Sequence, residues 1–257
     1  LQNDQAHAMS GSNSMCAVTA ILETGMMEMI EPETVVTLDT AAGLVRATAA
    51  CKDGKVTGVT LDMPPSFVAI ADAKVDTPQW GRVTYNLCYG GVFYALVDVD
   101  QIGSTIAPEN ARELAEKGIL LRDMIATQTD ITHPEIPEVN GLAYVMFHSR
   151  DEDGAVRTCT TLKPARADRS PCGTGTNSTM ALMHATGDIS LGDKITTRSI
   201  INGDFRAELI GEAQIGPYKG SRVRVTGQCW IYGMSQIGLD PGDPFPSGFI
   251  LSDTWGG

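Results

Sequence analysis

A short sequence pattern occurs twice in the chain, and each copy carries a different reactive atom. The first copy places the hydroxyl of Ser10 before a glycine, and the second places the thiol of Cys172 there. Gly25 and Gly187 close the two copies, each 15 positions after the reactive residue. Two half-sites of one design, each with one side chain that can carry a proton, predict acid–base chemistry on the two faces of one substrate carbon.

Each copy has the composition of a loop that leads into a helix. Ser, Thr and Asn gather where the helix would begin, and their oxygens could cap free backbone N–H groups there. Apolar residues follow at helical spacing, as at Met15, Val18 and Leu22. Gly187 suits the end of the second helix. The free N–H groups and the dipole at each helix N-terminus favour an anion such as a carboxylate.

The two reactive residues are expected to differ in basicity. The field of the helix is expected to lower the pKa of Cys172, whereas the hydroxyl of Ser10 ionises far above neutral pH. Taken alone, a Ser-Gly-Ser-Asn segment is typical of a solvated turn. A single Cys-Gly-Thr-Gly segment is typical of a bend or a phosphate cradle, but no lysine follows the glycines as a P-loop requires. The matched spacing of the two copies favours a paired site.

Composition excludes several classes of partner. The 257 residues carry a formal net charge of −12, which argues against binding to nucleic acid or to an anionic membrane. No apolar run approaches the roughly 20 residues of a membrane span, and no signal-peptide pattern is present. The six cysteines and four histidines lack the spacing of a metal site. We expect a reduced, cytoplasmic protein without a metal, with Cys16, Cys88 and Cys229 in its core.

A β-hairpin is expected after each copy of the pattern. The hairpins are predicted at residues 34–49 and 194–209, and each is followed by a further strand, at 55–61 and 221–226. Between the copies, two strand-like runs flank Gly90-Gly91, and a helix is expected to start at Pro108, with its first part ending at Gly118. This order predicts an α+β protein with two pseudo-symmetric lobes and a site between them.

The repeat also suggests a division of the chain. Residues 1–70 are predicted to form the remainder of the first lobe, residues 71–239 the second lobe, and residues 240–257 to return to the first. Cys172 is preceded in its half by a long stretch that begins near Asp76, whereas Ser10 is preceded by nine residues. We therefore expect most of the upstream part of the first lobe to be absent.

Several segments resemble the proline racemase superfamily, which includes hydroxyproline 2-epimerases and trans-3-hydroxy-L-proline dehydratases. The most specific segment is Asp-Arg-Ser-Pro-Cys-Gly-Thr-Gly at residues 168–175. The others lie at residues 9–13, 89–94, 108–114 and 239–248. The resemblance implies a diaminopimelate-epimerase-like fold, two α/β lobes with the site in the cleft, and catalysis without a cofactor.

The resemblance also implies roles for individual residues. Ser10 stands where many members carry the first catalytic cysteine, and Cys172 matches the second. Asp168 matches the residue that meets the ring nitrogen of the substrate. Four further residues match positions that bind the substrate carboxylate: Gly11, Ser12, Gly173 and Thr174. The pairing of serine with cysteine resembles a subgroup associated with both 4-hydroxyproline 2-epimerisation and trans-3-hydroxyproline dehydration.

The predicted function is a cofactor-independent 4-hydroxyproline 2-epimerase that transfers a proton at Cα between Ser10 and Cys172. Its partner is a small molecule, hydroxyproline or proline, and a homodimer is left open. A secondary amine cannot form the pyridoxal Schiff base of a primary amine, so the carbanion-like transition state must be stabilised by fixed dipoles. If the substrate carries a 3-hydroxyl, the same carbanion can expel it, which adds a dehydratase activity.

Four alternatives remain open at this point. A dedicated trans-3-hydroxy-L-proline dehydratase and a proline racemase share the proposed site. A thiol hydrolase would use Cys172 as its nucleophile and would need a histidine directed at the sulfur. His184, 12 positions later, is the residue to consider for that role. An inactive amino-acid-binding homologue would bind a ligand without moving a proton.

Overall fold

The computed structural model describes residues 9–40 and 43–248. Its helices are α1 (Gly11–Glu23), α2 (Ala111–Gln128) and α3 (Gly173–Thr186), with two 3-10 turns at Val99–Ile102 and Pro108–Asn110. The strands before α2 are β1 (Glu33–Thr40), β2 (Gly43–Lys52), β3 (Lys55–Asp62), β4 (Ser66–Thr77), β5 (Gly81–Tyr89) and β6 (Phe93–Asp98). The strands after α2 are β7 (Leu142–Arg150), β8 (Val156–Leu162), β9 (Arg166–Ala167), β10 (Lys194–Ser199), β11 (Asp204–Ile215) and β12 (Tyr218–Gly227).

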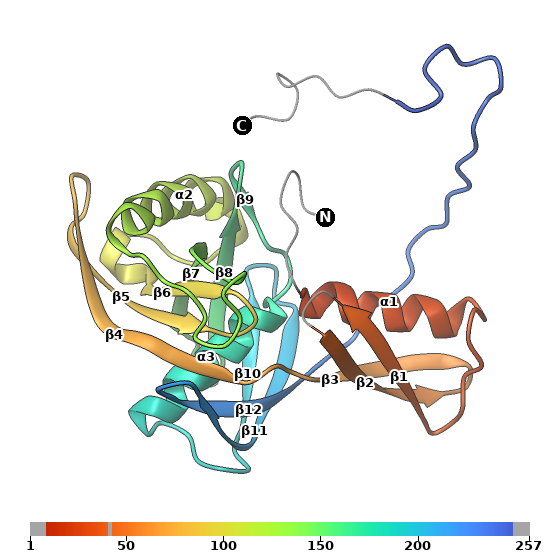
Figure 1. Ribbon diagram of the computed structural model, residues 1–257, viewed down its shortest axis with the longest axis horizontal. Coiled ribbons are helices and arrows are strands. Elements are labelled where there is room, and N and C mark those ends of the chain that lie inside the picture. The colour runs from red at the N-terminus through yellow and green to blue at the C-terminus, as the bar shows by residue number, and fades with distance from the viewer. Residues whose placement is uncertain (1–8, 41–42, 249–257) are drawn as a thin grey trace.

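The strands form one continuous mixed sheet that closes partly on itself. Its order is β1-β2-β3-β12-β11-β10-β8-β7-β6-β5-β4, and β4 also pairs with β12. Eight strands, from β12 round to β4, therefore form a closed ring, while β1, β2 and β3 extend from it as an open antiparallel sheet. Figure 1 shows α1 lying across these three strands, with α3 near the centre of the molecule and α2 on the far side.

The alternation of side chains along the strands explains how α2 and α3 can pack on opposite faces of the same sheet. Successive residues of a strand point to opposite faces. On β6, Phe93 and Ala95 join a core with α2, whereas Tyr94 and Leu96 join a second core that contains Cys172. All five residues of Phe93–Val97 are buried. β6 is therefore an interior strand that brings one of its faces to the N-terminus of α3.

Both hairpins predicted from the sequence are present as β1–β2 and β10–β11. The predicted α+β class is confirmed. The apolar spacing of the first helix is also confirmed, because Met15, Val18 and Leu22 are all buried on α1. Its last turn ends with Thr24 as C-cap, and α3 ends at Gly187 in the left-handed conformation.

Two local expectations are wrong. α2 continues through Gly118, because this glycine is a close-packing position: an added Cβ would overlap the side chain of Thr161 on β8. Cys16 is exposed, because it lies on the face of α1 that does not meet the sheet. Cys88 is buried as expected, and Cys229 is half-buried.

The predicted division into residues 1–70 and 71–239 stays a prediction. Residues 240–248 are exposed, and the remainder of the segment predicted to return to the first lobe, residues 249–257, lies outside the described residues. Within the described part of the chain, no helix is long and apolar enough to cross a membrane.

Candidate active site

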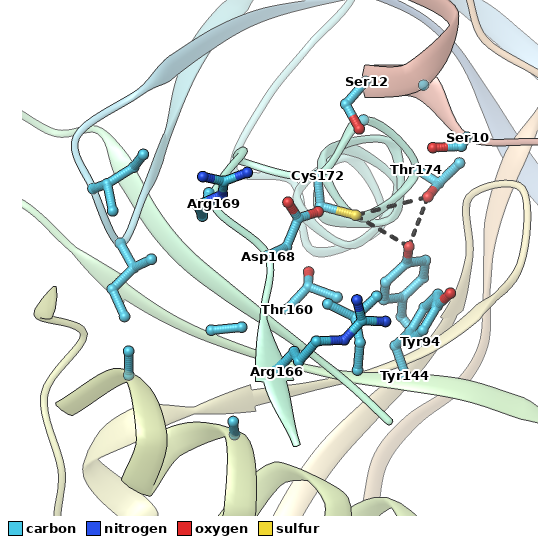
Figure 2. Close-up of a pocket in the computed structure, with 18 of the residues that line it drawn as sticks. Ser10, Ser12, Tyr94, Tyr144, Thr160, Arg166, Asp168, Arg169, Cys172 and Thr174 are labelled. Carbon is cyan, nitrogen blue, oxygen red and sulfur yellow. Dashed lines mark hydrogen bonds between the residues drawn. The ribbon is translucent and has the colours of Figure 1, made fainter. Parts of the chain in front are cut away.

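A pocket of about 820 Å³ opens where the N-termini of α1 and α3 meet. All seven residues singled out in the sequence line it: Ser10, Gly11, Ser12, Asp168, Cys172, Gly173 and Thr174. They come from two segments far apart in the chain, the start of α1 and the β9–α3 connection. The fold therefore brings the two copies of the repeated pattern to one cavity (Figure 2).

The two helix N-termini touch through their first glycines. A Cβ added to Gly173 would lie 2.9 Å from the Cα of Gly11, and one added to Gly11 would lie 3.0 Å from the Cα of Gly173. Only glycine at both positions permits this approach without a shift of the backbone. Both helix dipoles therefore present their positive ends to the same pocket, which favours a bound anion.

The reactive residues occupy the N-cap positions of their helices, but neither caps its helix with its side chain. Ser10 is the N-cap of α1 and Cys172 the N-cap of α3, and no side-chain cap hydrogen bond forms at either. The capping expected from the sequence is therefore absent at these two positions. Both reactive residues line the pocket together with the first residues of their helices.

Backbone conformation differs between the two N-caps. Ser10 is extended, with φ −133° and ψ 110°. Cys172 has φ 66° and ψ 108°, a region that non-glycine residues rarely adopt. Such conformations cost of order 1–3 kcal/mol and gather at functional sites, where the surrounding structure enforces them. The surrounding packing therefore holds Cys172 in this strained conformation.

Cys172 lies in a nearly closed environment. It is 8% exposed, and its Sγ lies 3.2 Å from Tyr94 Oη and 3.8 Å from Thr174 Oγ1. Burial raises the pKa of the thiol, and the nearby carboxylate of Asp168 raises it further. The hydroxyl of Tyr94 and the backbone N–H of Gly175 oppose this shift. The lowered pKa expected from the helix field is therefore wrong, because desolvation has the largest effect on the thiol and raises its pKa.

Asp168 is positioned by its own backbone and by the residues that follow it. Its N–H donates to the carbonyl oxygen of Thr160 at 2.8 Å, and its Oδ1 accepts from the N–H of Ser170 at 2.8 Å. Burial is the largest effect on this carboxyl and raises its pKa above the usual value. In Figure 2 its carboxylate lies beside Cys172. A cationic amine brought into the pocket would find a fixed acceptor there.

Other polar residues in the pocket have no counterpart in the sequence predictions. Tyr94, Tyr144 and Thr160 line one wall, and three arginines also contribute to the lining: Arg112, Arg166 and Arg169. These arginines make the pocket locally more positive than a chain of net charge −12 would suggest. Tyr94 ends the segment at 89–94 that carries part of the family resemblance, so a signal for it existed in the sequence.

His184 does not belong to the site. It lies near the C-terminal end of α3, where its Nδ1 is 2.8 Å from Ser221 Oγ. Among the described residues that line the pocket there is no histidine. The base that a thiol hydrolase would need beside Cys172 is therefore not supplied by this residue.

Comparison with known proteins agrees with the geometry. A model of the proline racemase family matches residues 1–250. The chain is 54% identical over 256 residues to 4-hydroxyproline 2-epimerase 1 of Rhizobium rhizogenes, an alignment that covers 100% of this chain and 74% of the relative.

Two solved structures are similar over the whole chain. One is a hydroxyproline epimerase from Agrobacterium vitis with bound trans-4-hydroxy-L-proline, at 53% identity and a TM-score of 0.92, with 74% of that chain covered. The other is a probable proline racemase from Agrobacterium radiobacter with bound carbonate, at 54% identity and a TM-score of 0.92, with 76% of that chain covered. These matches confirm the expected enzyme class, an amino-acid racemase or epimerase, and the chain belongs to the proline racemase family.

Proposed function

We propose that this protein is a 4-hydroxyproline 2-epimerase that transfers a proton at Cα between Ser10 and Cys172 without a cofactor. The observation that carries the proposal is the convergence of these two reactive residues, from opposite halves of the chain, on one pocket. The activities named for the relatives at 52–54% identity support the choice of hydroxyproline.

The pocket offers complementary groups for each charged part of such a substrate. The carboxylate fits the helix N-termini, where Gly11, Gly173 and the side chains of Ser12 and Thr174 lie together. The cationic ring nitrogen fits the carboxylate of Asp168. Binding at both ends fixes Cα between the two reactive residues, and the same dipoles stabilise the negative charge that develops when its proton leaves.

The proton transfer follows from the different acidity of the two groups. In one direction the Cys172 thiolate takes the Cα proton and becomes a thiol, and the carbanion then takes a proton from the Ser10 hydroxyl on its other face. Solvent in the open part of the pocket returns a proton to the serine, and loss of the proton from Cys172 to solvent restores the thiolate. Because the serine hydroxyl is protonated near neutral pH and a carbanion is a stronger base than an alkoxide, Ser10 works mainly as the donor and Cys172 as the base.

The difference in acidity between Cys172 and Ser10 also favours a second reaction, elimination from a 3-hydroxylated substrate. Once Cys172 has removed the Cα proton, the carbanion can expel a hydroxyl at C3, and this step needs no protonation of Cα from the opposite face. A trans-3-hydroxy-L-proline dehydratase activity is therefore part of the proposal. We further propose that the enzyme works in the cytoplasm. The order of activity on trans-4-hydroxyproline, trans-3-hydroxyproline and proline would separate this proposal from a dedicated dehydratase or a proline racemase.

A D₂O experiment tests the proposal. Incubation with trans-4-hydroxy-L-proline should exchange the α-hydrogen and yield the cis-D epimer, without added pyridoxal phosphate or metal. Trans-3-hydroxy-L-proline should yield Δ1-pyrroline-2-carboxylate, and proline serves as the comparison substrate. An absence of exchange with all three would overturn the proposal. Calorimetric binding of pyrrole-2-carboxylate without exchange would instead indicate an inactive binding homologue.

A further inference from the structure

The hydroxyl of Tyr94 stands between the reactive thiol and the first turn of α3. Tyr94 Oη lies 3.2 Å from Cys172 Sγ and 2.6 Å from Thr174 Oγ1, and the sulfur and the threonine oxygen are 3.8 Å apart. Figure 2 shows these three atoms as a triangle joined by dashed lines. The tyrosine is fully buried, so its hydroxyl has these two groups as its partners within the described structure.

The turn before β6 fixes this triangle against α3. A Cβ on Gly91, whose φ is 130°, would lie 2.7 Å from Thr174 Cγ2, and one on Gly90 would overlap the carbonyl oxygen of Thr174. Asn177 Nδ2 donates to the Gly90 carbonyl at 3.1 Å. The turn that leads into Tyr94 is therefore packed closely against the first turns of α3.

The phenol has one proton for two acceptors. Burial holds the pKa of Tyr94 well above its ordinary value, so the phenol stays protonated. It can donate to the sulfur or to Thr174 Oγ1. The threonine hydroxyl also has one proton, which it can donate to the phenol oxygen or to a ligand. The hydrogen bond that reaches the sulfur therefore depends on what Thr174 is bonded to.

We propose that Tyr94 is a positioning residue that donates to the Cys172 sulfur in the empty site and to Thr174 once a substrate carboxylate binds there. In the empty site Thr174 donates to Tyr94, and Tyr94 donates to the thiolate and stabilises it. When the carboxylate accepts a hydrogen bond from Thr174, the threonine oxygen accepts one from Tyr94 and the sulfur loses the Tyr94 donor. Both hydroxyls only rotate, and no covalent bond changes.

The consequence is a base whose strength follows substrate binding. A thiolate that loses a hydrogen bond has a higher proton affinity, and this loss coincides with the arrival of the Cα proton that it must remove. The inference rests on the proposed function, because it requires a carboxylate at Thr174. It adds a coupling between carboxylate recognition and proton abstraction that neither residue provides alone.

Other groups also act on the sulfur and must stay unchanged in the test. Asp168, from the β9–α3 connection, raises the pKa of Cys172, while the N–H of Gly175 and the hydroxyl of Thr160 on β8 lower it. Tyr144 on β7 lies close enough for its own pKa to be raised by the thiolate. Two arginines, Arg166 and Arg169, line the same pocket. Removing one hydroxyl at a time keeps all of these in place.

The first measurement needs no substrate. The rate of alkylation of Cys172 by iodoacetamide is followed against pH in the ligand-free protein, by peptide mass spectrometry because the exposed Cys16 will react as well. Tyr94→Phe should raise the pKa of Cys172 by roughly one unit, since it removes a hydrogen bond to a charged group. Tyr85→Phe is the matched control: Tyr85 is 4% exposed, its Oη lies 2.9 Å from Thr129 Oγ1, and it belongs to the core with α2.

A second variant separates the hydrogen bond from packing. Thr174→Val leaves the sulfur as the acceptor for the phenol, so the pKa of Cys172 in the ligand-free protein should stay unchanged or fall. An unchanged pKa in Tyr94→Phe, or a rise in both variants, overturns the proposal. If Tyr94→Phe fails to fold, as judged by thermal unfolding, a rise in Thr174→Val alone overturns it.

The third measurement tests the coupling itself. The pH dependence of kcat/KM reports the free enzyme and that of kcat the substrate complex. In the unmodified protein the pKa of the base should be higher in kcat than in kcat/KM, and in Tyr94→Phe this difference should close. An equal difference in both proteins overturns the coupling. If the alkylation shift is found but no protein exchanges the α-hydrogen, the proposed function fails while the hydrogen bond to the sulfur stands.

Discussion

The two half-sites start from the same sequence pattern and end in different surroundings. α3 buries ten of its 14 residues. It contacts β4, β5 and β6 of the ring as well as β11 and β12. α1 buries six of its 13 residues and packs against the open β2–β3 sheet. Cys172 is accordingly buried and its backbone strained, whereas Ser10 is half-buried and its backbone extended. The repeated pattern therefore places both reactive residues at a helix N-cap, and the surrounding fold determines how buried each one is.

The difference matters because the two groups need different surroundings. A thiol can become a base near neutral pH, and its affinity for a proton responds strongly to burial and to neighbouring charges. A serine hydroxyl cannot ionise in that range, so burial adds little to its function as a donor. In the proposed mechanism the enclosed half is therefore the one that sets the basicity of Cys172, and the more open half is the one in which Ser10 exchanges protons with solvent.

Cys172→Ala is expected to have the largest effect, because it removes the base of the enclosed half. Exchange of the α-hydrogen from both epimers of 4-hydroxyproline should fall to background, as measured by NMR in D₂O. Alanine keeps the Cβ and therefore the same backbone constraint at φ 66°. Cys51→Ala, at a buried cysteine of the core between α1 and strands β1–β3, is the control and should keep exchange near the original rate. Persistent exchange in Cys172→Ala would mean that Ser10 alone can act as a base.

Gly173→Ala should break the contact that aligns the two halves. The added Cβ meets backbone and not a flexible side chain, so the helices must part. We expect a loss of about 1–3 kcal/mol in the free energy of unfolding, a lower Tm, and a large loss of kcat. Gly233→Ala is the control, because a Cβ there meets nothing within 4 Å and its φ lies outside the left-handed range. Equal Tm and kcat in the two variants would contradict a close contact between Gly11 and Gly173.

Ser10→Ala should separate exchange from epimerisation. Without the donor of the more open half, Cys172 can still remove and return a proton on its own face. One of the two epimers should then exchange its α-hydrogen with retention of configuration, at a reduced rate, while interconversion of the epimers disappears. Chiral chromatography and NMR on the same samples measure the two outcomes. Equal loss of both in this variant would show that the asymmetry has been misassigned.

The pH dependence of kcat/KM should report the ionisation of Cys172 and not that of Ser10. Because burial raises the pKa of Cys172, its base form is gained only as pH rises, and later than for an exposed thiol. The sign follows: kcat/KM for removal of the Cα proton from the Cys172 side should increase with pH, by about tenfold per unit below the pKa.

Ser10→Cys sharpens this comparison. A second thiol should add a second ionisation and bend the profile into a bell, since one sulfur must then be charged and the other protonated. With Ser10 in place, the profile should show no second ionisation between about pH 6 and pH 10. A bell-shaped profile in the unmodified protein would assign the second ionisation to another group of the pocket, with Asp168 the first to examine.

Much of this arrangement could be predicted from local patterns. The hairpins follow from strand-like runs joined by turn residues, and the helices from apolar spacing and their terminal glycines. The seven site residues could be predicted because they belong to two short segments whose resemblance to each other and to a family is visible in the sequence. Motifs of this kind specify which residues meet a substrate.

The remainder depends on contacts between distant segments. Tyr94 reaches the thiol from a strand 78 positions earlier, and no spacing rule relates the two. The sign of the Cys172 pKa shift was wrong because helix dipoles are visible in a sequence and desolvation is not. Gly118 suggests a helix end by composition, but its place against Thr161 is a matter of packing between α2 and β8.

The two touching glycines have a consequence for how such a site can change over time. Gly11 and Gly173 each follow directly after a reactive residue, and each is closed to any added carbon by the backbone of the other. Ser10 and Cys172 line the pocket instead. An exchange of oxygen for sulfur at either reactive position leaves the backbone contact untouched, whereas no partner substitution relieves a change at either glycine. The position whose reactive atom can change is therefore joined by one peptide bond to a position that must stay glycine. The chemistry of the pocket can diversify while the contact between the two helices is retained.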